Sequence, residues 1–353
     1  MTSTNPTRVT AAQLRLAFRD SPFTIAEAET VGVTRGRLRQ AYRSGMVSRV
    51  HRGWYAVPDM RDLDPSAPQR PGGAASPISP DALAVVRALE DRGAQPVIAG
   101  SLAARWWGLD LLADRFGAAP PAVILVNRHS AVRRGQRGGV LIRHADLDEI
   151  DIVRDSNGRA YTSALRTGVD CARGQHEINA FIVINSAVRR SLDSRIPQEP
   201  GLRPDARRLT DVAAQPAGAA HALQDLRSVL ERTSGCGISV VRGVLPIIDP
   251  RLESALESLS WWRFHEFGLV VPTPQQWVRG ASGRRYRVDF DFGGVVGECD
   301  GLVKYTQASD LRSEKERQMD IELGGRPVVR WGWQHMWRHP ERVMSAVQLA
   351  RGA

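Results

Sequence analysis

The first 58 residues combine helical and extended patterns of hydrophobic positions. Apolar residues recur at helical spacing in residues 10–20 and 34–45, and residues 24–31 predict a shorter helix between them. Thr24 and Thr34 stand where N-cap residues stand, and Gly45 follows the third helix as a stop signal. Residues 46–58 predict two short strands around His51 to Gly53. Three helices followed by a β-hairpin predict a winged helix-turn-helix.

The third of these helices has two different faces. Arg35, Arg39 and Arg43 recur every four residues on one face, while Leu38 and Tyr42 can face the core. A recognition helix needs this division, because its outer face reaches DNA while its inner face packs. The predicted DNA contacts are Arg35, Arg37, Arg39 and Arg43 of the helix and Arg49 and Arg52 of the wing. The alternative is an arginine face that is merely solvated.

A second regular pattern begins near residue 251. A helix over residues 251–268 precedes strands at 275–280, 285–292 and 295–301. A helix at 311–325, a strand at 327–333 and a helix at 340–352 complete the series. Three sequential strands followed by a helical crossover predict a mixed sheet with helices on both faces.

Four carboxylates flank a Gly-Gly pair within this pattern. They are Asp289 and Asp291 before Gly293 and Gly294, and Glu298 and Asp300 after them. A two-residue turn at the glycines places Asp289 opposite Glu298, on one face of the hairpin. Opposed like charges destabilise a strand pair unless they are neutralised, and Mg²⁺ (or Mn²⁺) bound by Asp289, Glu298 and Asp300 would neutralise them.

Each carboxylate also has an ordinary interpretation. Carboxylates on strands are commonly solvated, Asp289 can pair with Arg287, and Asp300 before Gly301 can belong to a turn. A bulge or a longer loop would shift the pairing. The metal site is therefore a hypothesis that depends on the register of the hairpin.

The charge of the chain favours a polyanionic partner. The 353 residues carry a net charge of +10, and residues 1–58 hold nine arginines against Asp20, Glu27 and Glu29. Of the 48 basic residues all but Lys304 and Lys315 are arginine. Lysine supplies a compact ammonium that can lose its proton, so these two positions are candidates for a functional role.

Composition also suggests where the domains meet. Residues 61–80 are rich in Pro, Gly, Ala and Ser and predict a linker, and residues 196–211 interrupt the chain a second time. The predicted division is 1–60, 61–80 (linker), 81–195, 196–245 (connecting segment) and 246–353. The predicted fold class is α/β multidomain, with an N-terminal winged helix-turn-helix, an α+β middle domain and a C-terminal α-β-β-β-α-β mixed sheet.

The sequence lacks the patterns of secreted proteins, membrane proteins and phosphate-binding loops. The start lacks the features of a secretory signal, and no apolar run reaches the roughly 18 residues of a membrane helix, so we expect a cytoplasmic protein with no membrane partner. Residues 135–139, "GQRGG", lack the lysine and Ser/Thr of a phosphate loop and predict a hairpin or loop.

The N-terminal segment resembles the winged-helix domain of AbiEi-family antitoxins, most clearly in "TRGRLRQAYRSGMVSRVHRGWYAVP". A weaker resemblance extends through residues 80–190, in "AGSLAARWWGL" and "TSALRTGVDCAR". In that family the N-terminal domain binds promoter DNA and represses a toxin-antitoxin operon. The resemblance implies DNA as a partner, together with a cognate toxin.

Residues 250–350 resemble the PD-(D/E)XK nuclease superfamily, and within it the Vsr-like branch. The resemblance implies that Glu257, Asp289 and Glu298 hold metal and activate water for phosphodiester hydrolysis. Asp300 stands where the superfamily has its lysine, and Lys304 in "ECDGLVKY" is the candidate replacement. Arg317 is expected to contact a phosphate or to pair with an acidic residue of the site.

These predictions combine into two hypotheses. The first is a DNA-binding protein with a metal-dependent endodeoxyribonuclease domain, whose catalytic residues are Glu257, Asp289, Glu298, Asp300 and Lys304, and which acts in defence or repair beside a restriction or repair partner. The second is a transcriptional repressor or type IV antitoxin-like regulator whose nuclease-fold domain is non-catalytic.

Overall fold

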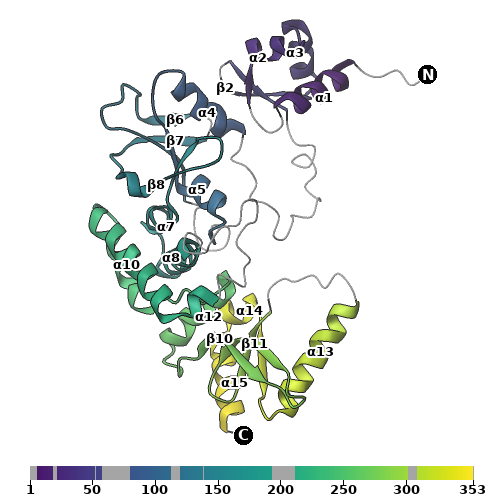
Figure 1. The fold of residues 1–353 in the computed structure, drawn as a ribbon, viewed down its shortest axis with the longest axis vertical. Helices are drawn as coiled ribbons and strands as arrows, with labels where there is room; N and C mark the ends of the chain where they lie inside the picture. Colours follow the sequence, from purple (N-terminus) through teal and green to yellow (C-terminus); the bar gives the residue numbers. More distant parts are fainter. Residues whose placement is uncertain are drawn as a thin grey trace, which may run out of the picture. The chain divides into compact units, whose positions relative to one another are not determined.

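The protein has a mixed α/β architecture with three β-sheets (Figure 1). The computed structural model describes residues 6–18, 22–51, 53–57, 80–112, 120–137, 139–192, 211–300 and 308–352. The chain forms two compact units, residues 1–108 with 119–170, and residues 109–118 with 171–353. The finer division into five segments stays a prediction.

Three helices and a small sheet form the N-terminal part of the first unit. The helices are α1 (Pro6–Phe18), α2 (Ile25–Thr30) and α3 (Arg35–Arg43), and strands β1 (Phe23–Thr24), β2 (Ser48–His51) and β3 (Trp54–Ala56) pair in the order β1-β3-β2. Both predicted N-caps are confirmed, since Thr24 accepts from the N–H of Glu27 and Thr34 from that of Arg37. Leu14 and Phe23 are fully buried in the core of these elements.

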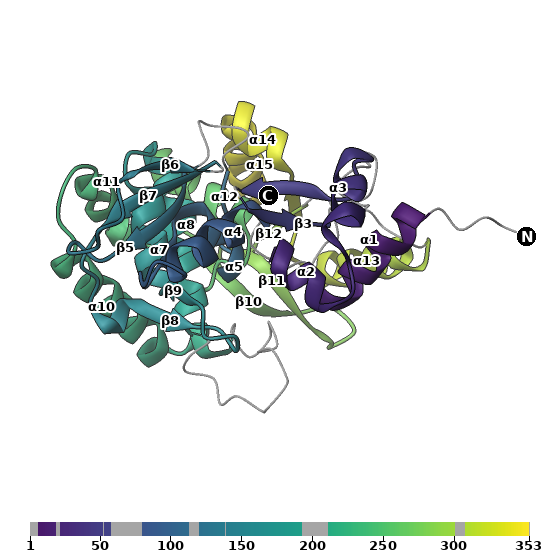
Figure 2. The same ribbon diagram turned by 90° about the horizontal axis from the view of Figure 1, so that it is seen from above.

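A six-stranded sheet completes this unit. Its elements are α4 (Pro80–Glu90), β4 (Val97–Ala99), α5 (Gly100–Trp107), β5 (Ala122–Val126), β6 (Gly135–Arg137), β7 (Val140–His144), η1 (Glu149–Asp151), β8 (Ile152–Arg154) and β9 (Ala160–Thr162), with α7 (Ala164–Ala172) after them. The strand order is β6-β7-β5-β4-β9-β8. Antiparallel β6 and β7 lie side by side (Figures 1 and 2), so the hairpin prediction for residues 135–139 is confirmed.

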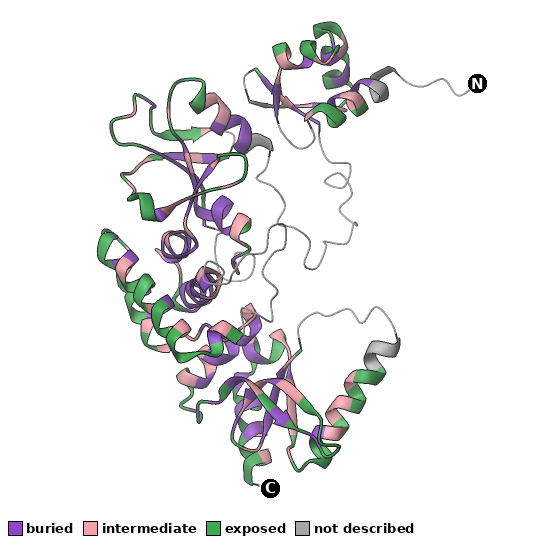
Figure 3. Cartoon of the chain, viewed as in Figure 1, coloured by how far each residue is buried: buried purple, intermediate pink, exposed green. Residues whose placement is uncertain are grey.

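Helices dominate the start of the second unit. They are α8 (Glu177–Ser191), α10 (Pro216–Arg232), α11 (Ile238–Val244) and η3 (Leu245–Ile247), and α8 is largely buried whereas α10 shows a wide exposed face (Figure 3). Asn185 of α8 accepts a hydrogen bond from the N–H of Asp249, and Arg189 pairs with Glu253 at 3.0 Å. These contacts fix the segment that leads into the next helix.

A four-stranded sheet with flanking helices follows. It comprises α12 (Ala255–Glu266), β10 (Thr273–Arg279), β11 (Arg285–Asp291), β12 (Val296–Cys299), α13 (Ala308–Leu323), β13 (Val328–Trp331), α14 (Trp333–Arg338) and α15 (Pro340–Gly352). The strand order is β10-β11-β12-β13, antiparallel except for the parallel pair β12-β13. The predicted mixed sheet is therefore observed, and α14 is an additional short helix between the predicted strand at 327–333 and the predicted helix at 340–352.

Aromatic packing joins this sheet to α12. The ring of Phe264, fully buried, lies 5.2 Å from the rings of Phe290 and Phe292 and 5.8 Å from that of Trp331. Gly297 on β12 makes this packing possible, because a Cβ there would lie 2.5 Å from the Trp331 ring. The indole N–H of Trp331 donates to the hydroxyl of Ser260 on α12. The sheet and α12 are thus held in one arrangement.

No helix in the part of the chain that the structure describes combines the length and the apolar composition needed to cross a membrane.

Candidate functional site

The arginines of α3 lie on its solvent side. Arg35, Arg39 and Arg43 are exposed and Arg37 is half-buried, while Leu38 is buried as predicted. The prediction for Tyr42 is wrong, since Tyr42 is 46% exposed and Ala41 takes the buried position instead. The reason is the phase of the helix: residue 41, three residues after Leu38, lies over the core, and Tyr42 packs its edge against the Tyr55 ring.

The helix face is strongly positive and unneutralised. Among the described residues no acidic side chain pairs with Arg35, Arg37, Arg39 or Arg43. Arg49 on β2 is exposed as well, and Arg52 lies outside the described residues. This face presents guanidinium groups that are available to an anionic partner.

Glu257 begins the candidate site of the second unit. It stands in the first turn of α12, 5% exposed, and its carboxylate accepts hydrogen bonds from the N–H of Glu253, the hydroxyl of Ser254 and the amide of Gln275. Burial, together with the negative charge of Asp289, raises the pKa of Glu257 from 4.5 to about 8. Three hydrogen bonds therefore fix the position of the Glu257 carboxyl group, and burial makes its ionisation unfavourable.

The hairpin register brings Asp289 toward the same place. Phe290 pairs with Gly297 and Asp291 with Val296, and Phe292 N–H donates to Val295, as the two-residue turn at Gly293 and Gly294 predicts. In that register Asp289 stands opposite Glu298. The carboxylate of Asp289 accepts from the backbone N–H of Cys299 at 2.7 Å. Burial nevertheless raises the pKa of Asp289, with only part of the shift offset by this hydrogen bond and by Arg317.

Glu298 completes the group from β12. Its side chain is buried, and its carboxylate accepts from the guanidinium of Arg317 on α13 at 2.8 Å. Burial and the charge of Asp289 raise the pKa of Glu298 from 4.5 to about 7, against the lowering effect of Arg317. Arg317 also pairs with Glu314 at 3.1 Å, so of its two predicted roles the structure shows the acidic partnership.

Asp300 and Asp291 are neutralised by other arginines. Asp300 is exposed and forms a two-pronged ion pair with Arg330, which also contacts Glu314. Asp291 pairs with Arg326 at 3.1 Å and accepts from the turn N–H of Gly293. The predicted residue Lys304 lies outside the described residues. The structure thus gathers Glu257, Asp289 and Glu298, and gives Asp300 an arginine partner.

Gln275 is a member of the site that sequence patterns did not single out. It is buried on β10 and, among described non-glycine residues, it is the one with a positive φ, at 55°. This unfavourable backbone conformation costs about 1–2 kcal/mol and turns the amide onto the carboxylate of Glu257, with the nitrogen 2.9 Å from Oε2. Strain of this kind clusters at functional sites, where the surrounding structure enforces it.

Arg287 does not neutralise Asp289. Its guanidinium pairs instead with Glu253, in the loop before α12, at 2.9 Å. The alternative interpretation of Asp289, as one half of an ion pair with Arg287, is therefore wrong. Among the described residues, Arg317 forms an ion pair with Glu298, and the more distant charge of Arg330 also lowers the pKa of Glu298.

The donor set suits a hard divalent cation. Carboxylate oxygens are the ligands that Mg²⁺ and Mn²⁺ prefer, and burial raises the pKa values of Glu257, Asp289 and Glu298, so a bound cation would favour their ionised forms. Within the described residues, no group of three or more His, Cys, Asp or Glu side chains is already spaced to hold a metal. Asp289 and Glu298 are the residues that could hold an ion here, with water as further ligands.

Comparisons with known proteins give similarity over part of the chain. A stretch of 126 residues, 35% of the chain, is 28% identical to two curated Mycobacterium tuberculosis proteins, named uncharacterized protein MT2308 (strain CDC 1551 / Oshkosh) and uncharacterized protein Rv2248 (strain ATCC 25618 / H37Rv). The match covers 46% of each. The chain thus spans about half the length of the curated relatives it matches. No family model matches the chain.

Proposed function

We propose that this protein binds DNA through α3 and cleaves or grips it with a metal-dependent endonuclease-like domain of the PD-(D/E)XK type. The observation that carries the proposal is the convergence of Glu257, Asp289 and Glu298 from α12, β11 and β12. Burial raises the pKa of all three carboxyls, and the charge of Asp289 raises those of Glu257 and Glu298 further. A bound divalent cation would stabilise their ionised forms, and metal-dependent phosphodiester hydrolysis uses such a cation.

Different residues of this site would bind the metal, accept a proton and orient the carboxylates. Asp289 and Glu298 would hold Mg²⁺ or Mn²⁺, which when bound supplies charge to a phosphate oxygen and increases the acidity of water. Glu257, whose pKa of about 8 leaves it mostly protonated at neutral pH, would accept a proton from an attacking water in its ionised form, at pH 8 or above. Arg317 orients the Glu298 carboxylate, and Gln275 orients that of Glu257.

The N-terminal elements support the DNA-binding half of the proposal. The helices α2 and α3, followed by the hairpin β2-β3, have the order of a winged helix-turn-helix. The exposed arginines of α3 are suited to phosphate and base contacts, since guanidinium groups bind phosphate oxygens in pairs. The resemblance to AbiEi-family antitoxins agrees with DNA as the partner.

A plasmid cleavage assay tests the nuclease. Purified protein with Mg²⁺ or Mn²⁺ should convert supercoiled plasmid to nicked or linear forms, and Glu298→Ala should abolish the conversion. The matched control is Glu316→Ala, which removes an exposed carboxylate from α13 outside the site. Equal cleavage by wild type and Glu298→Ala would exclude this site as the catalytic centre.

A second function has its own support. Asp300 takes the position of the superfamily lysine and is held by Arg330, which favours a nuclease-like domain that binds DNA or a protein partner without cleaving. In this version the chain is a repressor or antitoxin-like regulator. It predicts a metal-independent gel shift on the chain's own promoter and no cleavage by wild type with either metal.

A further inference from the structure

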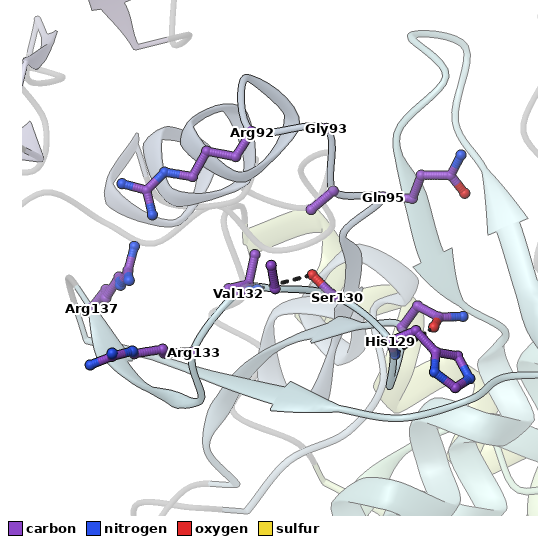
Figure 4. A pocket seen from close by; sticks show the side chains of 11 residues that line it. Arg92, Gly93, Gln95, His129, Ser130, Val132, Arg133 and Arg137 are labelled. Atoms are coloured by element: carbon purple, nitrogen blue, oxygen red, sulfur yellow. Dashed lines mark hydrogen bonds between the residues drawn. The ribbon is translucent and has the colours of Figure 1, made fainter.

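A basic pocket lies at the edge of the six-stranded sheet, far in sequence from both surfaces described above (Figure 4). Its volume is about 710 Å³, and Arg92, Arg133 and Arg137 gather on one side while Gln95 and His129 line the other. None of the described residues that line it is an aspartate or a glutamate. Among the described residues, none of the three arginines has an acidic partner. The pocket is therefore a concave concentration of positive charge.

The sequence concentrates the charge in one segment. Residues 127–143 contain five arginines and no acidic residue. This segment includes β6, which stands at the edge of the sheet and is largely exposed. Arginines on an exposed sheet edge discourage pairing with another strand, but that purpose does not require a pocket. The concave shape therefore calls for a different explanation.

Hydrogen bonds fix the loop that carries Arg133. Asn127 accepts from the N–H of His129 through its side chain and from Ser130 through its backbone carbonyl. The carbonyl of Val132 lies 2.7 Å from Nε2 of His144 on β7, and the Val132 side chain is buried in the core of the sheet. The backbone that places Arg133 is thus determined before any ligand binds, which lowers the entropy cost of binding.

We propose that this pocket binds phosphate groups of a DNA backbone, as a second DNA contact besides α3. Guanidinium groups bind phosphate oxygens with paired hydrogen bonds, and the amides of Gln95 and Asn127 can donate to and accept from sugar or base atoms. The inference rests on the proposed DNA binding and adds the middle of the chain to it.

The connection between the pocket and the N-terminal elements favours DNA over a free nucleotide. Arg92 follows α4, and Arg87 on α4 donates to the carbonyl of Pro22, pairs with Glu27 and lies over the Trp54 ring. The pocket and α3 therefore belong to one compact unit. A long polyanion can use both surfaces, whereas a mononucleotide would use the pocket alone.

Fluorescence anisotropy with a labelled random-sequence duplex tests the proposal. The double variant Arg133→Ala/Arg137→Ala should weaken binding about tenfold near 0.15 M salt and reduce the slope of log K against log salt by about 2, since each lost phosphate contact removes about 0.9. The control is Arg105→Ala/Arg154→Ala, which removes two exposed arginines outside the pocket, one of them at the opposite edge of the sheet. The control should bind like wild type, within about twofold.

The outcomes separate this inference from the proposed function. If wild type binds DNA and the pocket variant equals the control, the pocket is not a DNA contact and the proposed function stands. If wild type does not bind DNA, the proposed function fails and the pocket proposal fails with it. ATP and inorganic phosphate are titrated in parallel, and tight binding of either that the pocket variant loses, with DNA affinity unchanged, overturns the choice of DNA.

Discussion

The arginines of α3 and the carboxylates of the second unit both place like charges side by side, in opposite environments. Arg35 and Arg39 are exposed, so water and salt screen their repulsion within about 8 Å at physiological ionic strength. Glu257 and Glu298 are buried, and burial raises the pKa of each carboxyl by making ionisation costly. Repulsion between the exposed arginines costs little free energy, and their positive charge can attract a polyanion. Repulsion between the buried carboxylates is relieved either by protonation or by a bound cation.

The largest expected effect is a loss of stability in the second unit that leaves the arginines of α3 unaffected. Phe264→Ala should lower the free energy of unfolding of the second unit by about 3–5 kcal/mol, because the ring is fully buried among three other aromatic rings. The arginine region depends on a different core. Denaturant unfolding should show the loss, while DNA affinity near 25 °C stays close to that of wild type. A large loss of DNA affinity without unfolding would show that binding depends on the carboxylate region.

Removal of the exposed charge should affect binding and leave stability unchanged. Arg35→Ala/Arg39→Ala should weaken promoter binding by about tenfold or more and reduce its salt dependence, because two phosphate or base contacts are lost. The thermal midpoint should stay within a few degrees of wild type, since both side chains lie in water. Gel shifts at several salt concentrations measure the first effect. An unchanged shift would remove α3 from the DNA interface.

Buried charge should make stability depend on pH. The folded-state pKa of Glu257 is raised from 4.5 to about 8 and that of Glu298 to about 7, so the stabilising protonated forms are present below pH 4.5 and are lost as pH rises through 7 and 8. We expect the thermal midpoint of the metal-free protein to decrease as pH rises from 5 to 9. Glu257→Gln, which keeps the shape and cannot ionise, should flatten the upper part of this fall.

Asp110 supplies a control for that experiment. Burial raises the pKa of Asp110 to about 6, so it contributes a loss of the same sign at lower pH. Asp110→Asn should make the fall below about pH 6 shallower and leave the part between pH 6 and pH 8 unchanged. A profile that Glu257→Gln does not change would contradict the electrostatic description of the site.

The smallest effect is expected at Gln275. Gln275→Ala removes the amide that holds Glu257, and the cleavage rate should fall about two- to tenfold, with little change in DNA affinity. Gln275→Gly relieves the positive φ as well, so it should be more stable than the alanine variant by about 1 kcal/mol. Single-turnover rates measure the first effect and denaturant unfolding the second. Equal rates in wild type and both variants would show that the amide positions nothing.

Local chemistry explains what the sequence could predict. The N-caps at Thr24 and Thr34 and the hairpin register at Gly293 and Gly294 depend on neighbouring residues, and each is observed. The two-residue strand β1 escaped prediction, because its pairing with β3 joins residues that stand 30 or more positions apart. The sequence predicts Tyr42 in the core where the structure has Ala41, because the helical period alone does not fix which of two adjacent residues faces the core.

Tertiary contacts set the rest of the site. Arg287 could have paired with Asp289 of its own strand, yet the loop before α12 offers Glu253. Arg330 reaches Asp300 across the parallel pair β12-β13, a pairing that no local pattern specifies. No sequence pattern predicts the role of Gln275, because its strained backbone angle follows from the surrounding structure rather than from the residue type.

Calorimetric titration of Mn²⁺ into the metal-free protein at pH 8 tests the central claim most directly. Wild type should bind the ion saturably, and Asp289→Asn should lose that binding while its circular dichroism stays that of wild type. The control Glu316→Gln, altered outside the site on α13, should bind as wild type does. Equal Mn²⁺ binding by wild type and Asp289→Asn, or no binding by wild type, would contradict a cation site at the buried carboxylates.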